Sequence, residues 1–111
     1  MQYVESLGQE AREWLLALFV DAELNLLAVD TIARGELASC SVPFDRIIRR
    51  AFQLEAHAYL LVHNHPSGDP RPSESDILIT RRLARLSADL DVPLLDHLII
   101  AGERMMSCGD F

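Results

Sequence analysis

The sequence predicts an α/β domain in which helices sandwich a mixed β-sheet. Its 111 residues are the usual length of one domain, and half of them are apolar, so a hydrophobic core can form. Short apolar runs of strand length alternate along the chain with segments of helical periodicity, in the order β-β-α-β-α-β with a short final strand. We therefore expect a single domain over residues 1–111, with the polar residues 1–12 as a lead-in.

The first half of the chain predicts a hairpin followed by a helix. The continuous apolar runs Trp14–Val20 and Leu24–Ile32 have strand length, and the acidic segment 21–23 between them indicates a hairpin turn. Apolar residues then recur at helical spacing over residues 43–57, which predicts a helix. Pro43 suits the first turn of this helix, because its ring presets a helical φ.

The second half predicts a strand, a rigid loop, a second helix and two final strands. Residues 58–62 form a short apolar run, and the loop over residues 64–72 contains three prolines and a glycine. A helix opens at residues 73–76 with an apolar stripe at i, i+4, i+7 and i+11. This stripe consists of Ile79, Leu83, Leu86 and Leu90. Residues 94–101 read as a strand, and residues 104–107 as a short edge strand beside it.

The charge and cysteine content of the chain exclude several classes of protein. Seventeen acidic residues against ten basic ones give a net charge of −7, which argues against a nucleic-acid-binding module. Cys40 and Cys108 are too few for a disulfide framework, which favours a reducing cytoplasm. The first ten residues lack the pattern of a signal peptide, and no apolar run approaches the roughly 20 residues that span a bilayer. We expect a cytoplasmic protein that does not bind membranes.

Two histidines and an aspartate around the proline-rich loop predict a metal site. His63 and His65 stand at i and i+2 at the end of a strand, where both imidazoles face the same side. Asp76 follows after ten residues, in the first turn of a helix, and the loop between can fold back. Two imidazoles and one carboxylate suit Zn²⁺, and three protein ligands leave a fourth position for water. This arrangement is typical of catalytic zinc.

A hydrolytic zinc site also needs a general base and an oxyanion donor. Glu13 directly precedes the first strand and is the best candidate for the base, with Glu55 and Glu74 as weaker candidates. Ser73 is a candidate donor to a developing oxyanion. Two other readings stay open: Glu13 as a solvated charge, and Ser73 with Asp76 as a helix-capping pair.

These residues resemble a known signature. His-x-His, followed by seven residues, Ser, two residues and Asp, is the JAMM pattern, and the whole string over residues 63–76 resembles the RadC branch of the JAB/MPN superfamily. The resemblance covers roughly residues 10–108. It extends to an acidic residue before the first strand, a glycine after the second and an Asp-His pair in the late strand. These are Glu13, Gly35, Asp96 and His97.

The resemblance implies a cytidine-deaminase-like fold and a zinc metallopeptidase site that cleaves peptide or isopeptide bonds. His63, His65 and Asp76 would then hold Zn²⁺, Glu13 would activate the water and Ser73 would support the oxyanion. The partner would be a protein or peptide substrate. Two alternatives are a non-catalytic MPN-type interaction module and an accessory protein of DNA repair, although the net charge gives the latter no support. RadC proteins usually carry a helical segment before this domain, so we expect a short single-domain member or a fragment.

Overall fold

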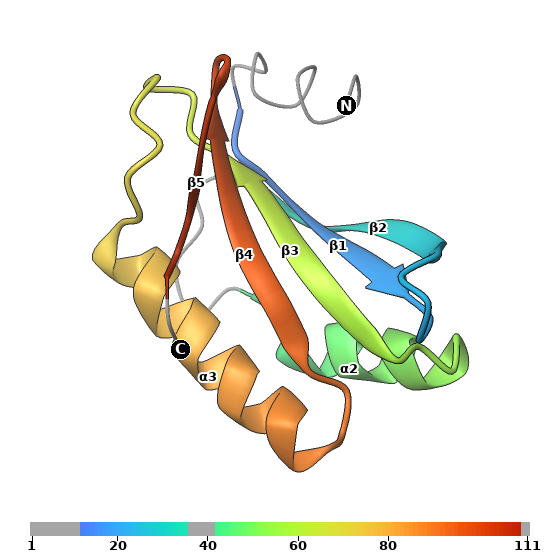
Figure 1. Ribbon diagram of the computed structural model, residues 1–111. Helices are drawn as coiled ribbons and strands as arrows, with labels where there is room; N and C mark the ends of the chain where they lie inside the picture. Colours follow the sequence, from blue (N-terminus) through green and yellow to red (C-terminus); the bar gives the residue numbers. More distant parts are fainter. Residues whose placement is uncertain (1–11, 36–41, 110–111) are drawn as a thin grey trace.

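The computed structural model describes residues 12–35 and 42–109 and has the predicted α/β class (Figure 1). In chain order the elements are β1 (Trp14–Val20), β2 (Leu26–Arg34), α2 (Phe44–Gln53), β3 (Ala58–Asn64), α3 (Glu74–Asp89), β4 (Leu94–Ala101) and β5 (Arg104–Ser107). The five strands form one sheet in the order β2-β1-β3-β4-β5. The β3–β4 pair is parallel and the other pairs are antiparallel, which confirms the mixed sheet. Most of the predicted lead-in, and Cys40, lie outside the described residues.

The β1–β2 hairpin turn is longer than the sequence predicts. The Asp21 carboxylate accepts hydrogen bonds from the backbone N–H groups of Glu23 and Asn25, and Leu24 has a φ of 66°. This local network keeps the chain in a turn through Asn25, since a short Asp side chain competes with the strand ladder for backbone donors. Strand β2 therefore begins at Leu26, two residues later than predicted.

Helix α2 is shorter than predicted at both ends. Pro43 is the N-cap and not part of the first turn, and the helix ends at Gln53. Its end is set by Glu55, which has a φ of 52°, so the chain leaves the right-handed region. The following N–H of Ala56 donates to the carbonyl of Ala51 at 2.9 Å, as in a Schellman motif.

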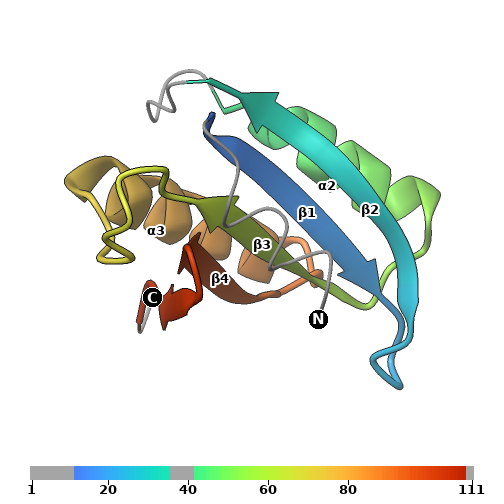
Figure 2. The ribbon, with the colours of Figure 1, turned by 90° about the horizontal axis from the view of Figure 1, so that it is seen from above.

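One hydrophobic cluster joins both helices to the same face of the sheet. Side chains of β1 and β3 that alternate with those of the opposite face pack against Ile47 of α2 and Ile79 and Leu83 of α3. Both helices lie behind the strands in Figure 2. The predicted stripe of α3 is wrong in its second half, because Leu86 and Leu90 are each 37% exposed and the buried face continues through Ser87.

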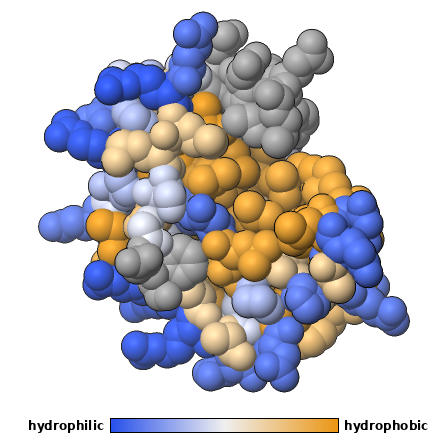
Figure 3. Space-filling model, viewed as in Figure 1, coloured by the Kyte–Doolittle hydropathy of each residue, from blue (hydrophilic) through white to orange (hydrophobic). Residues whose placement is uncertain are grey.

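The other face of the sheet is also apolar. Leu16, Val62 and Ile100 form a second, smaller cluster there, with Trp14 and Leu18 packed against it. Figure 3 shows hydrophobic side chains over the sheet, with hydrophilic ones at the margins. The helices that the structure describes both cover the first face. Within residues 12–35 and 42–109, therefore, helices cover only one of the two faces of the sheet. Neither of these two helices is long and apolar enough to cross a membrane.

Candidate metal centre

The site lies where β3 ends beside its parallel neighbour β4. His63 is the sixth residue of β3 and is 1% exposed, while His65 follows the strand and continues the ladder by donating its N–H to the Ile100 carbonyl at 2.8 Å. The two imidazole rings lie 4.8 Å apart, edge to face. The i, i+2 spacing therefore brings both rings to one side, as the sequence predicts.

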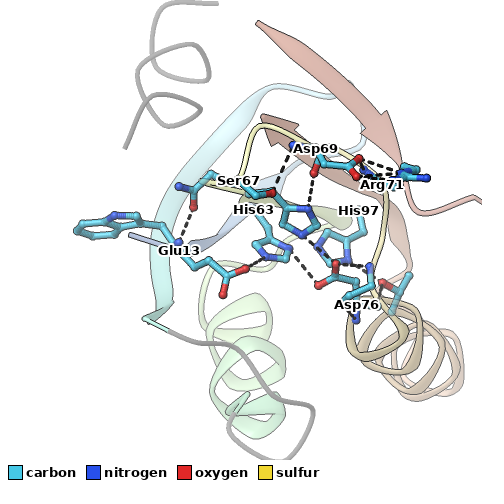
Figure 4. Close-up of polar contacts among 12 residues, drawn as sticks. Glu13, His63, Ser67, Asp69, Arg71, Asp76 and His97 are labelled. Atoms are coloured by element: carbon cyan, nitrogen blue, oxygen red, sulfur yellow. Dashed lines mark hydrogen bonds and ion pairs between the residues drawn. The ribbon is translucent and has the colours of Figure 1, made fainter. Parts of the chain in front are cut away.

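The proline-rich loop folds back, so that Asp76 lies beside both histidines. Figure 4 shows the Asp76 side chain near His63. Asp76 Oδ2 lies 3.0 Å from His65 Nε2, and Asp76 Oδ1 lies 3.4 Å from His63 Nδ1. The loop also orients the second imidazole, because His65 Nδ1 donates to the backbone carbonyl of Asp69 at 2.9 Å. Arg71 in turn binds the Asp69 carboxylate at 2.6 Å, which ties this part of the loop together.

Glu13 reaches the site from the start of β1. Its Oε1 lies 3.2 Å from His63 Nε2, and its side chain is 26% exposed. The structure thus places the residue predicted to be the general base beside the histidines. Of the two weaker candidates, Glu55 lies just before β3 begins, at the far end of that strand from His63.

Asn64 supports the backbone beside the site and was not among the residues predicted from the sequence. Its side-chain Oδ1 accepts from the backbone N–H of Trp14 at 2.6 Å, and its Nδ2 donates to the backbone carbonyl of Arg12 at 2.7 Å. The two bonds hold the backbone on both sides of Glu13. Asn64 itself is fully buried. Its position between the two histidines could have indicated this role. Alternate side chains of a strand face opposite sides, so the side chain of Asn64 points away from the two imidazoles.

The site has too few protons for its hydrogen bonds, so lone pairs of imidazole nitrogens face lone pairs of carboxylate oxygens. Because His65 Nδ1 carries the proton donated to Asp69, the neutral ring has a bare Nε2, and this atom faces a carboxylate oxygen of Asp76. Both nitrogens of His63 also face carboxylate oxygens, and a neutral ring has one proton for the two of them. Two of the three N···O contacts therefore lack a proton, and a cation between these atoms removes the repulsion.

The pKa values of His63 and Asp76 are both shifted down, so additional protons do not readily bind between these side chains. Burial lowers the pKa of His63 and outweighs the opposing effect of the Asp76 charge. For Asp76, burial alone would raise the pKa, but the hydrogen bond from the Ser73 backbone and the nearby His63 bring it below its usual value. The site thus favours a neutral imidazole and an ionised carboxylate, which are the forms that bind a metal.

Ser73 and Asp76 form a capping box at the start of α3. Ser73 Oγ accepts from the Asp76 N–H at 3.0 Å, and the Ser73 N–H donates to Asp76 Oδ2 at 2.8 Å. The capping interpretation is therefore correct for this pair. It leaves the hydroxyl proton of Ser73 for another acceptor, since Ser73 Oγ only accepts in the cap.

A set of three side chains in this part of the molecule offers atoms for a metal ion. One ligand atom each from Glu13, His63 and His65 lies within 4.8 Å of the others. This set includes the predicted base in addition to the two predicted histidine ligands. Asp76 instead contacts the two histidines from the side of α3. The donor types fit a divalent transition metal.

The chain is similar to known proteins along nearly its whole length. A family model described as "RadC-like JAB domain" matches residues 1–110. A UPF0758 protein of Bordetella petrii is 41% identical over 105 residues, which are 95% of this chain and 47% of that protein. A UPF0758 protein of Neisseria meningitidis serogroup B is 39% identical over 101 residues, which are 91% of this chain and 45% of that protein. The chain therefore spans about half the length of these curated relatives, whose names state no activity.

Proposed function

Because this chain belongs to the RadC-like JAB domain family, we propose that it is a zinc-dependent hydrolase that cleaves a peptide or isopeptide bond in a protein or peptide substrate. The observation that carries the proposal is the surplus of lone pairs among Glu13, His63, His65 and Asp76, in a site where burial favours the unprotonated ring of His63. JAB domains are often hydrolytic, and such a donor set suits a catalytic metal.

We assign the three ligands to His63, His65 and Asp76. His65 is prepared for this role by the Asp69 carbonyl, which keeps the proton on Nδ1 and the lone pair on Nε2. A zinc ion held there would lower the pKa of a bound water and polarise the substrate carbonyl. Three protein ligands leave room for both interactions.

Glu13 then acts as the proton carrier. Its carboxylate takes a proton from the attacking water and returns it to the leaving amine, which lets the C–N bond break with a neutral product. Asn64 supports this step by bonding the backbone on either side of Glu13. Ser73 donates a hydrogen bond from its hydroxyl to the carbonyl oxygen as negative charge develops there, while a lone pair of Oγ continues to cap α3.

Elemental analysis of the purified chain tests the ligand assignment. We expect about one zinc per chain, a loss of zinc in His63→Ala and Asp76→Asn, and retention of zinc in Glu13→Gln. His57→Ala is the matched control, because His57 is exposed and lies at the opposite end of β3. A wild-type chain that is free of metal after purification without chelators would overturn the proposal. If Glu13→Gln loses zinc as completely as His63→Ala, Glu13 is a ligand and not the base.

Hydrolysis is tested separately with a peptide library prepared by digesting a bacterial proteome. The zinc-loaded wild type is expected to create new amino termini, detected by mass spectrometry, that are missing with Glu13→Gln at equal zinc content. Equal yields of new termini from both proteins would contradict the role of Glu13. Zinc binding without any cleavage would favour the alternative of a non-catalytic interaction module.

A further inference from the structure

A buried threonine–histidine pair contacts the candidate metal centre. Thr80 is on α3, one turn after Asp76, and His97 is on β4, and each is 1% exposed. Thr80 Oγ1 lies 2.6 Å from the Asp76 carbonyl oxygen and 2.6 Å from His97 Nδ1. The His97 ring stacks on the ring of His63 with centroids 5.5 Å apart and planes 30° apart. The pair therefore contacts two of the proposed ligands at once. Figure 4 shows His97 beside His63 and Asp76.

The protons of this pair can be assigned from the acceptors around it. A hydroxyl has one proton, and the Asp76 carbonyl can only accept, so the Thr80 proton points to Asp76. The contact to His97 then requires that Nδ1–H donates to Thr80 Oγ1. Within the described part of the chain the buried Nε2 of His97 has no hydrogen-bond partner, and a ring that is 1% exposed favours the neutral form, so Nε2 is bare.

An unpartnered buried acceptor costs free energy, so a ring without polar atoms would suit a purely structural contact better. The position of His97 next to His63 suggests a role beyond a structural contact. A neutral ring stacked on His63 restricts the rotation of that imidazole and adds no positive charge beside the metal. The Nδ1–H bond fixes the orientation of the stacked ring through Thr80.

We propose that His97 and Thr80 are positioning residues that hold the His63 ring and the Asp76 backbone in the geometry that a metal ion requires. The inference rests on the ligand set given under the proposed function. It predicts that the pair contributes to metal affinity and not only to the attachment of α3 to the sheet.

The chain contains a matched comparison for the structural role. Tyr59 on β3 and Ser87 on α3 share a buried hydrogen bond between their hydroxyl groups. Ser87 lies seven residues after Thr80, which is two turns further along the same face of the helix. Both pairs attach α3 to the sheet, but only the Thr80–His97 pair touches proposed ligands.

Zinc affinity measured on the metal-free chain tests the inference. The probe is zinc ion alone, titrated in competition with a chromophoric chelator, and urea unfolding of the metal-free chain is followed in parallel. We expect His97→Phe and Thr80→Val to weaken zinc binding about ten- to a hundredfold. Thr80→Ser keeps the hydroxyl and is expected to stay within about twofold of wild type, and Tyr59→Phe to lower stability with unchanged zinc affinity. The double variant is expected to lose no more than either single variant, because the two residues act as one unit.

The outcomes separate this inference from the proposed function. Wild-type zinc affinity in both His97→Phe and Thr80→Val overturns the inference and leaves the metal site intact. An equal loss of affinity in Tyr59→Phe also overturns it, because the effect would then come from helix attachment in general. A wild-type chain that binds no zinc overturns the proposed function, and this inference with it.

Discussion

The two hydrogen bonds between Asn64 and the backbone on either side of Glu13 can be tested by mutation. Asn64→Ala removes the acceptor for the Trp14 N–H and the donor to the Arg12 carbonyl, at 2.6 Å and 2.7 Å. Asn64 is fully buried, so water does not simply take the place of its amide. We expect the variant to be less stable and to hold Glu13 less firmly.

The size of the effect follows from the number of bonds. A hydrogen bond contributes roughly 1 kcal/mol net, and two are lost, so the free energy of unfolding should fall by about 2 kcal/mol. For a domain of this length such a loss lowers the midpoint of thermal unfolding by roughly 10 °C. Asn25→Ala is the matched control, because the Asn25 side chain donates to Asp21 at an exposed position and its loss should cost under about 0.5 kcal/mol.

Urea unfolding followed by circular dichroism measures this difference on the metal-free chain. The fluorescence of Trp14, the only tryptophan, gives a second signal beside the altered contact. The reasoning is refuted if Asn64→Ala and Asn25→Ala unfold with the same free energy. A stable Asn64→Ala chain would mean that the two hydrogen bonds beside Glu13 contribute nothing to the stability of the fold.

Three further predictions concern pH, metal and backbone strain. Burial lowers the pKa of His97 to about 4 from 6.5, so the unfolded chain takes up a proton first as the pH falls. The free energy of unfolding of the metal-free chain should therefore decline between pH 6.5 and 4, by up to about 3 kcal/mol, and more weakly in His97→Phe; equal slopes would contradict this. Zinc at about 100 times its dissociation constant should raise the free energy of unfolding by roughly 2.7 kcal/mol, and calorimetry without such a shift would contradict a metal site of the folded state. Glu55→Gly should stabilise the chain by about 0.5–1 kcal/mol in urea unfolding, because Glu55 has a left-handed φ at the end of α2; a loss of stability would show that this strain is absent.

The strands and the loop were predictable because their signals are local. The apolar runs at β1 and β4 predicted the bounds of these strands correctly, because turn residues flank each run, and the short edge strand β5 also has its predicted bounds. The C-terminal end of α2 and the start of β2 were less predictable. Their positions depend on single residues with a positive φ, Leu24 and Glu55, at which the sequence shows no glycine.

The second half of the α3 stripe failed for a different reason. Leu86 looks like a core residue by spacing, but the buried position belongs to Ser87, whose hydroxyl bonds Tyr59. A polar residue in the core is favourable only where a partner is present, and the partner comes from a distant strand. Local periodicity carries no information about that partner.

The sequence by itself determined the class of fold, the family and the side chains that could hold a metal. These follow from patterns within short segments, namely apolar periodicity and the spacing of His63, His65, Ser73 and Asp76. Only the tertiary structure decided how the ligand atoms meet and what supports them. Glu13 comes to the site because β1 pairs antiparallel with β3, and the supports Asn64, Thr80 and His97 act across strands and a helix that lie far apart in the chain. Such contacts depend on the pairing register and on burial, which a pattern of neighbouring residues does not contain.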